Sequence, residues 1–90
     1  MKYIYYPFKF MIPMAAITLL AFGQLAELFG DTELTIHASD TAGLQESLIQ
    51  RFPELKNKKY LLAVNKQVVS ANVQLQEGAT VAMLPPFSGG

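Results

Sequence analysis

The chain has 90 residues, and 51% of them are apolar, which favours one small folded domain over a disordered chain. Seven basic side chains balance seven acidic ones, so the sequence lacks the excess positive charge typical of nucleic-acid binding. There is no cysteine, which excludes disulfides, thiolate metal ligands, cysteine nucleophiles and a persulfide held on a side chain. His37 is the only histidine. A single histidine argues against a His-based metal cluster or a Ser-His triad. We expect His37 to be an ordinary strand residue.

Residues 1–13 are predicted to be an extension that lies outside the folded domain. The apolar run Phe10–Gly23 is similar to a signal peptide, but it is too short and too interrupted for a membrane span. Met14 is a natural start, so residues 1–13 are expected to be flexible or to lie upstream of the true start. The domain is predicted to cover residues 14–90, with a tail at 85–90. An alternative is a secreted or membrane-tethered protein built on the N-terminal segment.

Two strands separated by a short helix are predicted in the first half of the domain. Ile17–Phe22 is an apolar run with a β-branched start, which is typical of a central strand buried on both faces. Gln24–Phe29 is predicted to be a short helix that Gly30 ends as its C-cap. Glu33–Ala38 alternates polar and apolar residues, as half-buried strands do. The two strands are expected to form a hairpin with a partly helical connection.

One longer helix follows, and it is predicted to pack against the sheet. Ser39–Thr41 supplies side-chain oxygens that can cap its first turn. Leu44, Leu48 and Phe52 recur with the helical period and form an apolar stripe that is expected to face the core. Pro53 is predicted to end the helix.

The second half of the domain is predicted to contain a basic loop and the remaining strands. Glu54–Lys59 is expected to be a solvated loop, with a docking role for Lys56, Lys58 and Lys59 as the alternative. Asn65–Gln67 is expected to be a turn. Pro85-Pro86 ends the last strand, because proline donates no ladder hydrogen bond. The predicted strands are Leu61–Val64, Val68-Val69 and Thr80–Leu84. One long helix cannot cover both sides of a parallel sheet, so the sequence predicts an α+β domain whose mixed, mainly antiparallel sheet wraps around that helix.

The chain ends with Gly89-Gly90, after a predicted strand and the rigid step Pro85-Pro86. Glycine has no Cβ, so such an end can enter a channel that is too narrow for other residues. C-terminal carboxyl groups have ordinary pKa values of about 3.5, so they are ionised at neutral pH and need activation before a nucleophile attacks them. The sequence also carries no cluster of catalytic side chains. Such an end is useful if the backbone's own carboxyl group is the reactive group, and the rest of the sequence must decide whether it is.

Three stretches of sequence are informative together: Leu20–Gly30, Leu62–Ser70 and Leu75–Gly90, the last of which contains the specific ending Pro-Pro-x-x-Gly-Gly. On these stretches the domain from about Met14 onward resembles the ubiquitin-like β-grasp sulfur carriers. It is most similar to the small subunit of molybdopterin synthase. The resemblance implies a ubiquitin-like β-grasp fold.

The resemblance also implies a sulfur carrier of molybdenum cofactor biosynthesis. A separate activating enzyme, similar to ubiquitin E1 enzymes, would consume ATP to adenylate Gly90, and sulfur would then replace the adenylate to give a thiocarboxylate. The large catalytic subunit of the synthase would accept the tail, and the thiocarboxylate sulfur would attack the pterin precursor, cyclic pyranopterin monophosphate. The chain would be a non-catalytic, sulfur-donating subunit of a cytoplasmic heterotetramer. It would bind no cofactor, metal, nucleic acid or membrane itself.

Each residue of the tail has an expected role in this scheme. Gly90 is the covalent site, Gly89 is its slim neighbour, and Ser88 is a small spacer. Pro85-Pro86 limits backbone freedom and lowers the entropic cost of inserting the tail into a partner. Phe87 is either an anchor in the partner's groove or a cap on the domain's own core. We also expect a partner-binding face of apolar residues on the sheet.

The sequence departs from the family's pattern at three positions. Ala26 stands where family members often carry arginine, which puts a partner contact from the first short helix in doubt. Asn65-Lys66 stands where Asn-Gly is common, so the turn type could differ. Phe87 occupies a position that a smaller residue often holds. Two other functions stay open: a sulfur carrier of another pathway, such as thiamine thiazole synthesis, and a ubiquitin-like interaction module whose tail is inert.

Overall fold

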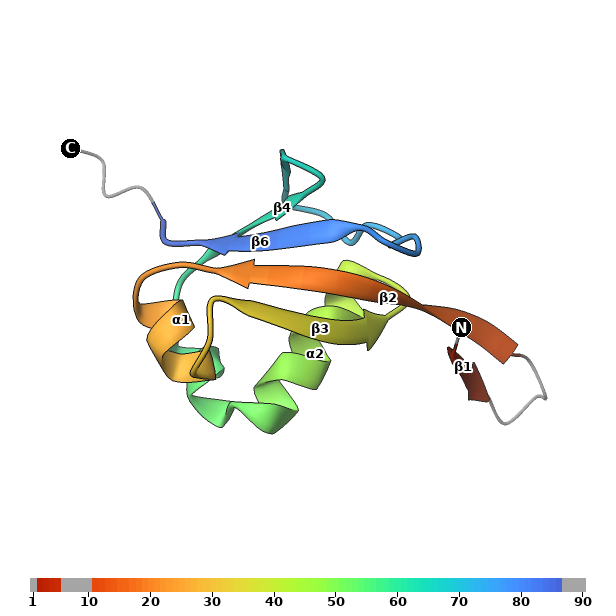
Figure 1. Ribbon diagram of the computed structural model, residues 1–90, viewed down its shortest axis with the longest axis horizontal. Coiled ribbons are helices and arrows are strands. Elements are labelled where there is room, and N and C mark those ends of the chain that lie inside the picture. The colour runs from red at the N-terminus through yellow and green to blue at the C-terminus, as the bar shows by residue number, and fades with distance from the viewer. Residues whose placement is uncertain (1, 6–10, 87–90) are drawn as a thin grey trace.

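The computed structural model describes the backbone of residues 2–5 and 11–86 and the side chains of residues 14–86. Six strands form one mixed sheet, and the helices pack against one side of it (Figure 1). This arrangement confirms the predicted α+β class. The elements in chain order are β1 (Lys2–Tyr5), β2 (Met11–Ala21), α1 (Gln24–Phe29), β3 (Glu33–Ala38), α2 (Thr41–Arg51), the 3-10 helix η1 (Pro53–Asn57), β4 (Leu61–Val64), β5 (Gln67–Val69) and β6 (Thr80–Leu84).

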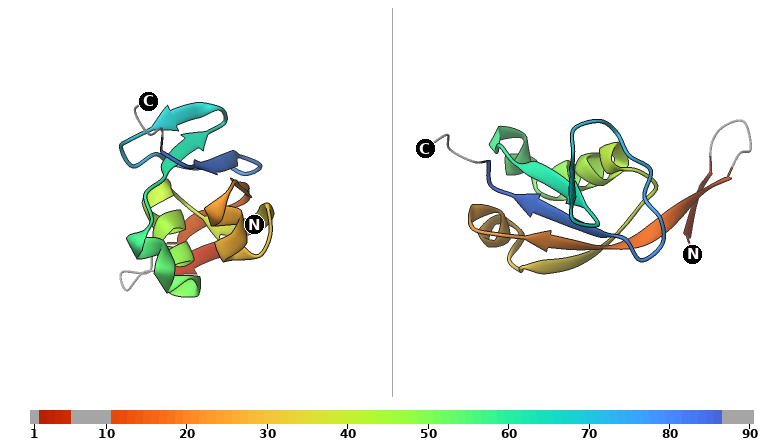
Figure 2. Two further views of the ribbon diagram at one scale, coloured as in Figure 1. Left: turned by 90° about the vertical axis from the view of Figure 1, so that its left-hand side faces the viewer. Right: turned by 90° about the horizontal axis from the view of Figure 1, so that it is seen from above.

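Strand β2 is the centre of the sheet. It pairs antiparallel with β3 along Ala15–Leu20, and α1 lies in their connection, which confirms the predicted hairpin. It also pairs parallel with β6, with Thr18 opposite Thr80 and Ala21 opposite Met83. Strand β4 pairs antiparallel with both β6 and β5. The first and last long strands therefore lie side by side and run in the same direction, as the two perpendicular views of Figure 2 also show.

The predicted bounds of the first strand were wrong at both ends. Strand β2 begins at Met11 rather than Ile17, because β1 pairs antiparallel with its first residues and supplies partners for their backbone groups. It ends at Ala21, one residue before the predicted end. The described parts of the expected extension are thus strand, at Lys2–Tyr5 and from Met11 onward. The division of the chain between residues 13 and 14 remains a prediction, and that boundary falls inside β2.

Strand β2 was expected to be buried on both faces, but the structure buries only one face completely. Ile17 and Leu19 point into the core and are almost fully buried, whereas Leu20 on the opposite face is half-buried. A strand alternates its side chains between the two faces, and the helices cover only one of them. Thr18, which lies on the same face as Leu20, is the one polar residue of the run and the one local sign of this difference.

Helix α2 seals the covered face of the sheet, as its apolar stripe predicted. Leu44 and Leu48 are both completely buried. Phe52, just past the helix end, is half-buried, and its ring centroid lies 4.9 Å from that of Phe29 at the end of α1. The core therefore consists of the inner face of the sheet, this stripe of α2 and the buried side of α1.

A small polar network holds the start of α2 in place. Asp40 is the N-cap, and its Oδ1 accepts a hydrogen bond of 2.7 Å from the backbone N–H of Gly43. Asn72 reaches this turn from the loop after β5. Its Oδ1 accepts bonds from the Ala42 backbone N–H and the buried Thr41 hydroxyl, and its Nδ2 donates to Asp40 Oδ2. Hydrogen bonds from Asn72 thus tie the loop after β5 to the first turn of α2.

The segment after α2 is not the fully solvated loop that its composition predicts. It contains η1, and Leu55 within that helix is 1% exposed. Pro53 opens the turn with a backbone angle that suits a helix start, and the turn directs Leu55 into the core. One apolar residue among lysines and glutamate is enough to anchor this segment.

The tight turn between β4 and β5 has the geometry of an Asn-Gly turn without the glycine. Val64 pairs with Gln67 across a two-residue loop. Asn65 has φ 48° and Lys66 has φ 74°, and positive φ at both positions is typical of a type I′ turn. The turn type therefore does not differ in this respect, although Lys66 stands where glycine fits best.

We expect Lys66→Gly to raise the free energy of unfolding by about 0.5–1 kcal/mol. A left-handed conformation costs a residue with a Cβ about 1–2 kcal/mol, and the greater freedom of glycine in the unfolded chain takes back part of this gain. Urea denaturation of both proteins measures the change. Lys66→Ala removes the same charge and keeps the strain, so it should lie within about 0.5 kcal/mol of the wild type. A Lys66→Gly protein less stable than the wild type would contradict the argument.

Candidate docking site at the carboxyl end of β6

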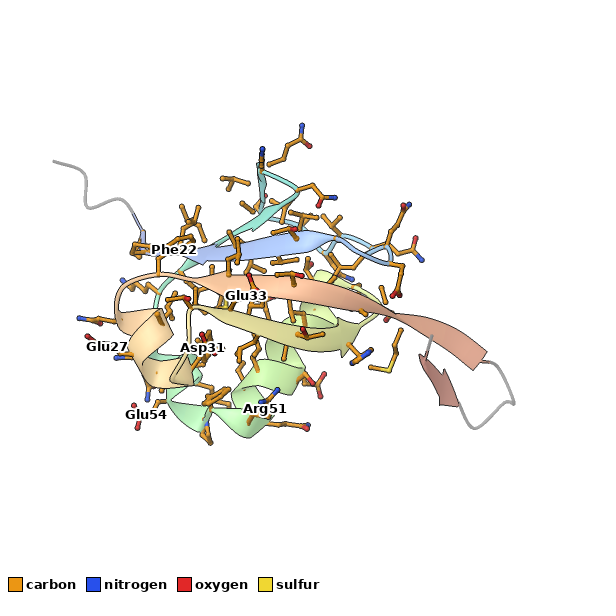
Figure 3. All side chains as sticks on the ribbon, in the orientation of Figure 1. Phe22, Glu27, Asp31, Glu33, Arg51 and Glu54 are labelled. Carbon is orange, nitrogen blue, oxygen red and sulfur yellow. The ribbon has the colours of Figure 1, made fainter. Side chains whose placement is uncertain are left out.

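The parallel pairing of β2 and β6 decides where the last strand leads. Because the two strands run in the same direction, their carboxyl ends meet at the same edge of the sheet. Met83 lies opposite Ala21, so Pro85 and Pro86 follow at the level of Phe22 and the start of α1. Figure 3 shows Phe22 next to the end of β6. The start of β4 lies there too, since Leu61 pairs with Leu84.

A surface cavity of about 600 Å3 opens at this edge. Three segments line it: the turn from β2 into α1, the segment that leads into β4, and the two prolines after β6. Phe22 is 45% exposed beside it, and Pro85 and Pro86 are exposed as well. The large or charged side chains and the prolines of the lining are Phe22, Lys58, Lys59, Pro85 and Pro86.

The sheet face opposite α2 is apolar near this cavity. Directly paired residues place side chains on the same face, so one row runs across four strands. The row consists of Leu20, Ala82, Ala63 and Val68, on β2, β6, β4 and β5 in turn. Leu84 and Leu61 form a second paired row on the same face, nearer to the cavity. We call these two rows the apolar sheet face.

The expected apolar face on the sheet is therefore present, although most of its members are half-buried. Val68 is the most exposed, at 60%, and Ala63 is shielded by its neighbours. Further along the same face, toward β3, the outward residues are polar, and one of them is charged. Thr18 lies between Thr35 and Thr80, and Glu33 lies opposite Leu20. A sheet face that is open to water is usually polar, so the apolar sheet face is a surface suited to a protein partner.

The predicted site residues divide into two groups. Phe87, Ser88, Gly89 and Gly90 lie outside the described residues. Pro85-Pro86 follows the last strand directly, which ends at Leu84 as predicted. Phe22 was expected inside a buried strand, which was wrong, because β2 ends at Ala21. Lys58 and Lys59 were expected to be solvated loop residues, with a docking role as the alternative, and both line the cavity. The position of Phe22 between an apolar run and Gly23 was the one local signal that it could leave the strand.

The remaining features near the site are structural. Ala26, where arginine was expected from the family's pattern, lies half-buried on α1 against the core. His37 is a half-buried strand residue, as predicted. A second surface cavity of about 390 Å3 lies near the start of α2 and includes His37, Asp40 and Glu46. Among residues 14–86, no three histidine, aspartate or glutamate side chains gather as they would around a metal ion.

Within the described part of the chain, no helix has the length and apolar character needed to cross a membrane.

A mixed sheet around one main helix, with its last strand parallel to the central strand, is the ubiquitin-like β-grasp fold. This places the molecule in the class of small ubiquitin-like β-grasp proteins. The chain belongs to the ThiS family, whose model matches residues 19–90. It is 30% identical over 79 residues to the molybdopterin synthase sulfur carrier subunit of Arabidopsis thaliana, and the match covers 82% of each chain.

Solved structures share the fold over nearly their whole length. The putative molybdopterin converting factor subunit 1 of Pyrococcus furiosus has a TM-score of 0.76 at 22% identity, covering 81% of this chain and 99% of that one. The small archaeal modifier protein 1 of Methanosarcina acetivorans has a TM-score of 0.74 at 22% identity, covering 86% and 98%. In the complex of subunits 1 and 2 of the molybdopterin-converting factor from Helicobacter pylori, the matched chain has a TM-score of 0.63 at 24% identity, covering 83% and 99%.

Proposed function

We propose that this chain is the sulfur carrier subunit of a molybdopterin synthase and serves molybdenum cofactor biosynthesis. The observation that carries the proposal is the 30% identity to a molybdopterin synthase sulfur carrier subunit across most of both chains. The geometry supports it, because β6 ends beside the apolar sheet face and Pro85-Pro86 line the cavity there. A thiazole-forming pathway and an inert interaction module have no such support.

The reactive group in this proposal is the carboxyl group of Gly90. Its carboxylate attacks the α-phosphate of ATP, pyrophosphate leaves, and an acyl-adenylate forms. A sulfur nucleophile then attacks the acyl carbon and adenylate leaves, so the end of the chain becomes a thiocarboxylate. The sulfur of that group attacks the pterin precursor on the large subunit, and water then cleaves the bond between the sulfur and the Gly90 acyl carbon, which leaves the sulfur on the product and restores the carboxylate. Gly89 keeps the tail slim, and Pro85-Pro86 restricts its backbone before insertion.

Two partner proteins supply what this chain lacks. An E1-like enzyme binds ATP and performs the adenylation, so the carrier itself holds no cofactor. The large subunit provides the acid–base and phosphate-binding groups for the reaction with the precursor. The complex of subunits 1 and 2 in the Helicobacter pylori structure supports a large-subunit partner for a protein of this fold. We place the reaction in the cytoplasm, where the carrier meets both partners.

Mass spectrometry of the intact chain tests the proposal. The chain is incubated with its E1-like enzyme, ATP and a sulfide source, and its mass should rise by the difference between sulfur and oxygen. The treated chain is then mixed with the large subunit and the pterin precursor, and the mass should return to its starting value as the dithiolene product forms. ATP omitted from the first step should leave the mass unchanged. A chain that gains sulfur but converts no pterin would point to another sulfur pathway.

A further inference from the structure

We propose that Lys58 and Lys59 form a basic rim beside the apolar sheet face and select a partner surface that bears carboxylates next to an apolar groove. The inference rests on the proposed function, and the partner in question is the large subunit that accepts the tail. These lysines would set how fast and how selectively the two proteins associate. No role in the chemistry is assigned to them.

The first argument is the uneven distribution of charge in a neutral chain. Residues 55–90 hold four of the seven basic side chains and one of the seven acidic ones, whereas residues 24–54 hold six acidic side chains and one basic one. The acidic set belongs mainly to α1, β3, α2 and η1. Figure 3 shows Glu27 and Glu54 on the helical side of the molecule, at the same end of the sheet as Phe22 but below it. Among the described residues that line the 600 Å3 cavity, Lys58 and Lys59 are the only charged ones, so the lining carries positive charge although the whole protein has none in excess.

The second argument is the position of the two lysines. Both line the 600 Å3 cavity together with Phe22 and Pro85-Pro86. Lys59 is exposed, and Lys58 is half-buried, which is the usual state of a lysine whose aliphatic stem packs while its ammonium group reaches water. They precede β4, whose first residue pairs with the last residue of β6, so their backbone is held next to the exit of the tail. The pairing of β4 with β6 therefore holds Lys58 and Lys59 beside Pro85-Pro86, where the tail begins.

The third argument concerns the combination of charge with apolar surface. An apolar patch alone binds many partners, whereas charges at its edge favour a partner with opposite charges and penalise one with like charges. Charges within roughly 8–10 Å of each other still attract at physiological ionic strength. Such rims act mostly on the association rate, which electrostatic attraction can raise by a factor of about 10 or more. The large subunit is therefore expected to carry acidic residues around the opening that admits the tail.

Association kinetics with the purified cognate large subunit test this inference. Stopped-flow measurements at low salt compare the wild type with Lys58→Glu/Lys59→Glu, and the double variant should associate at least about tenfold more slowly. The difference should shrink to less than about threefold near 1 M salt, where the Debye length is about 3 Å. Two matched controls are available. Lys58→Arg/Lys59→Arg keeps the charge and should behave as the wild type. Lys66→Glu, at the far end of β4, reverses one charge away from the cavity. It is compared with the single variant Lys59→Glu and should slow association much less.

The outcomes separate this inference from the proposed function. Equal association rates for the wild type and the Lys58→Glu/Lys59→Glu variant would overturn the basic rim and leave the carrier function standing. A slow variant whose deficit persists at high salt would also overturn it, because screening would have no effect. A wild-type chain that binds no large subunit would overturn both. Sulfur loading by the E1-like enzyme, read by mass, checks independently that each variant is folded.

Discussion

Removal of Gly90 is expected to abolish sulfur transfer while leaving the stability of the domain unchanged. The proposed chemistry uses one carboxyl group at one position, and a chain that ends at Gly89 places its carboxyl group about 3.5 Å short of that position. A displacement of this size is enough to lose a reaction that depends on near-attack geometry, where about 1 Å can cost roughly a hundredfold in rate. Intact mass after incubation with the E1-like enzyme, and product formation with the large subunit, measure the two steps separately.

A tail lengthened by one residue provides the opposite change. An added alanine after Gly90 should also abolish transfer, because it moves the carboxyl group and introduces a Cβ into the slim end. Both variants should unfold at the wild-type urea concentration, since within residues 14–86, whose side chains the structure describes, the buried core residues lie between Ala15 and Met83. Normal product formation by the shortened chain would disprove the assignment of Gly90 as the covalent site.

Leu48→Ala is expected to cost the domain a large share of its stability. Leu48 is completely buried between the helix and the sheet, and truncation of such a leucine costs about 3–5 kcal/mol in lost transfer energy and residual cavity. A domain of this size has a total free energy of unfolding of roughly 5–13 kcal/mol. The variant should therefore lose between a quarter and most of its stability. Thermal unfolding should show a fall in Tm of more than about 10 °C.

Val68→Ala is the matched control for this substitution. It also shortens an apolar side chain, but Val68 is 60% exposed on β5, so the cost should be within about 0.5 kcal/mol. The same variant should weaken binding to the large subunit, because Val68 belongs to the apolar sheet face. If Leu48→Ala cost no more than Val68→Ala, α2 would not be the element that closes the core.

Local elements could be read from the sequence with good accuracy. The bounds of α1, β3, β4 and β6 agree with their predictions, because each combines a clear apolar period with a strong stop signal. Gly30 ends α1 in a left-handed conformation, and the two prolines after β6 admit no further ladder bond. The stripe of α2 likewise gave its buried face correctly, since only one side of that helix is apolar.

The predictions that were wrong, for the start of β2, Leu55 and Phe22, share a physical cause. The early start of β2 depends on pairing with β1, and the burial of Leu55 depends on a turn that directs one side chain inward. The exposure of Phe22 depends on where the sheet ends. Each outcome is decided by a neighbour that is distant in sequence or by the packing of a whole layer, and neither leaves a mark on the local pattern.

The amino-acid sequence by itself determined most of the helix and strand segments, the single core and the candidate reactive end, because these depend on local periods, stop residues and the type of the last residues. Only the tertiary structure decided which surfaces surround that end. The parallel pairing of β6 with β2, and the antiparallel pairing of β4 with β6, bring Phe22, Lys58-Lys59 and Pro85-Pro86 to one edge. Strand order and register arise from long-range burial of a shared face, so no local stretch of the chain encodes them alone.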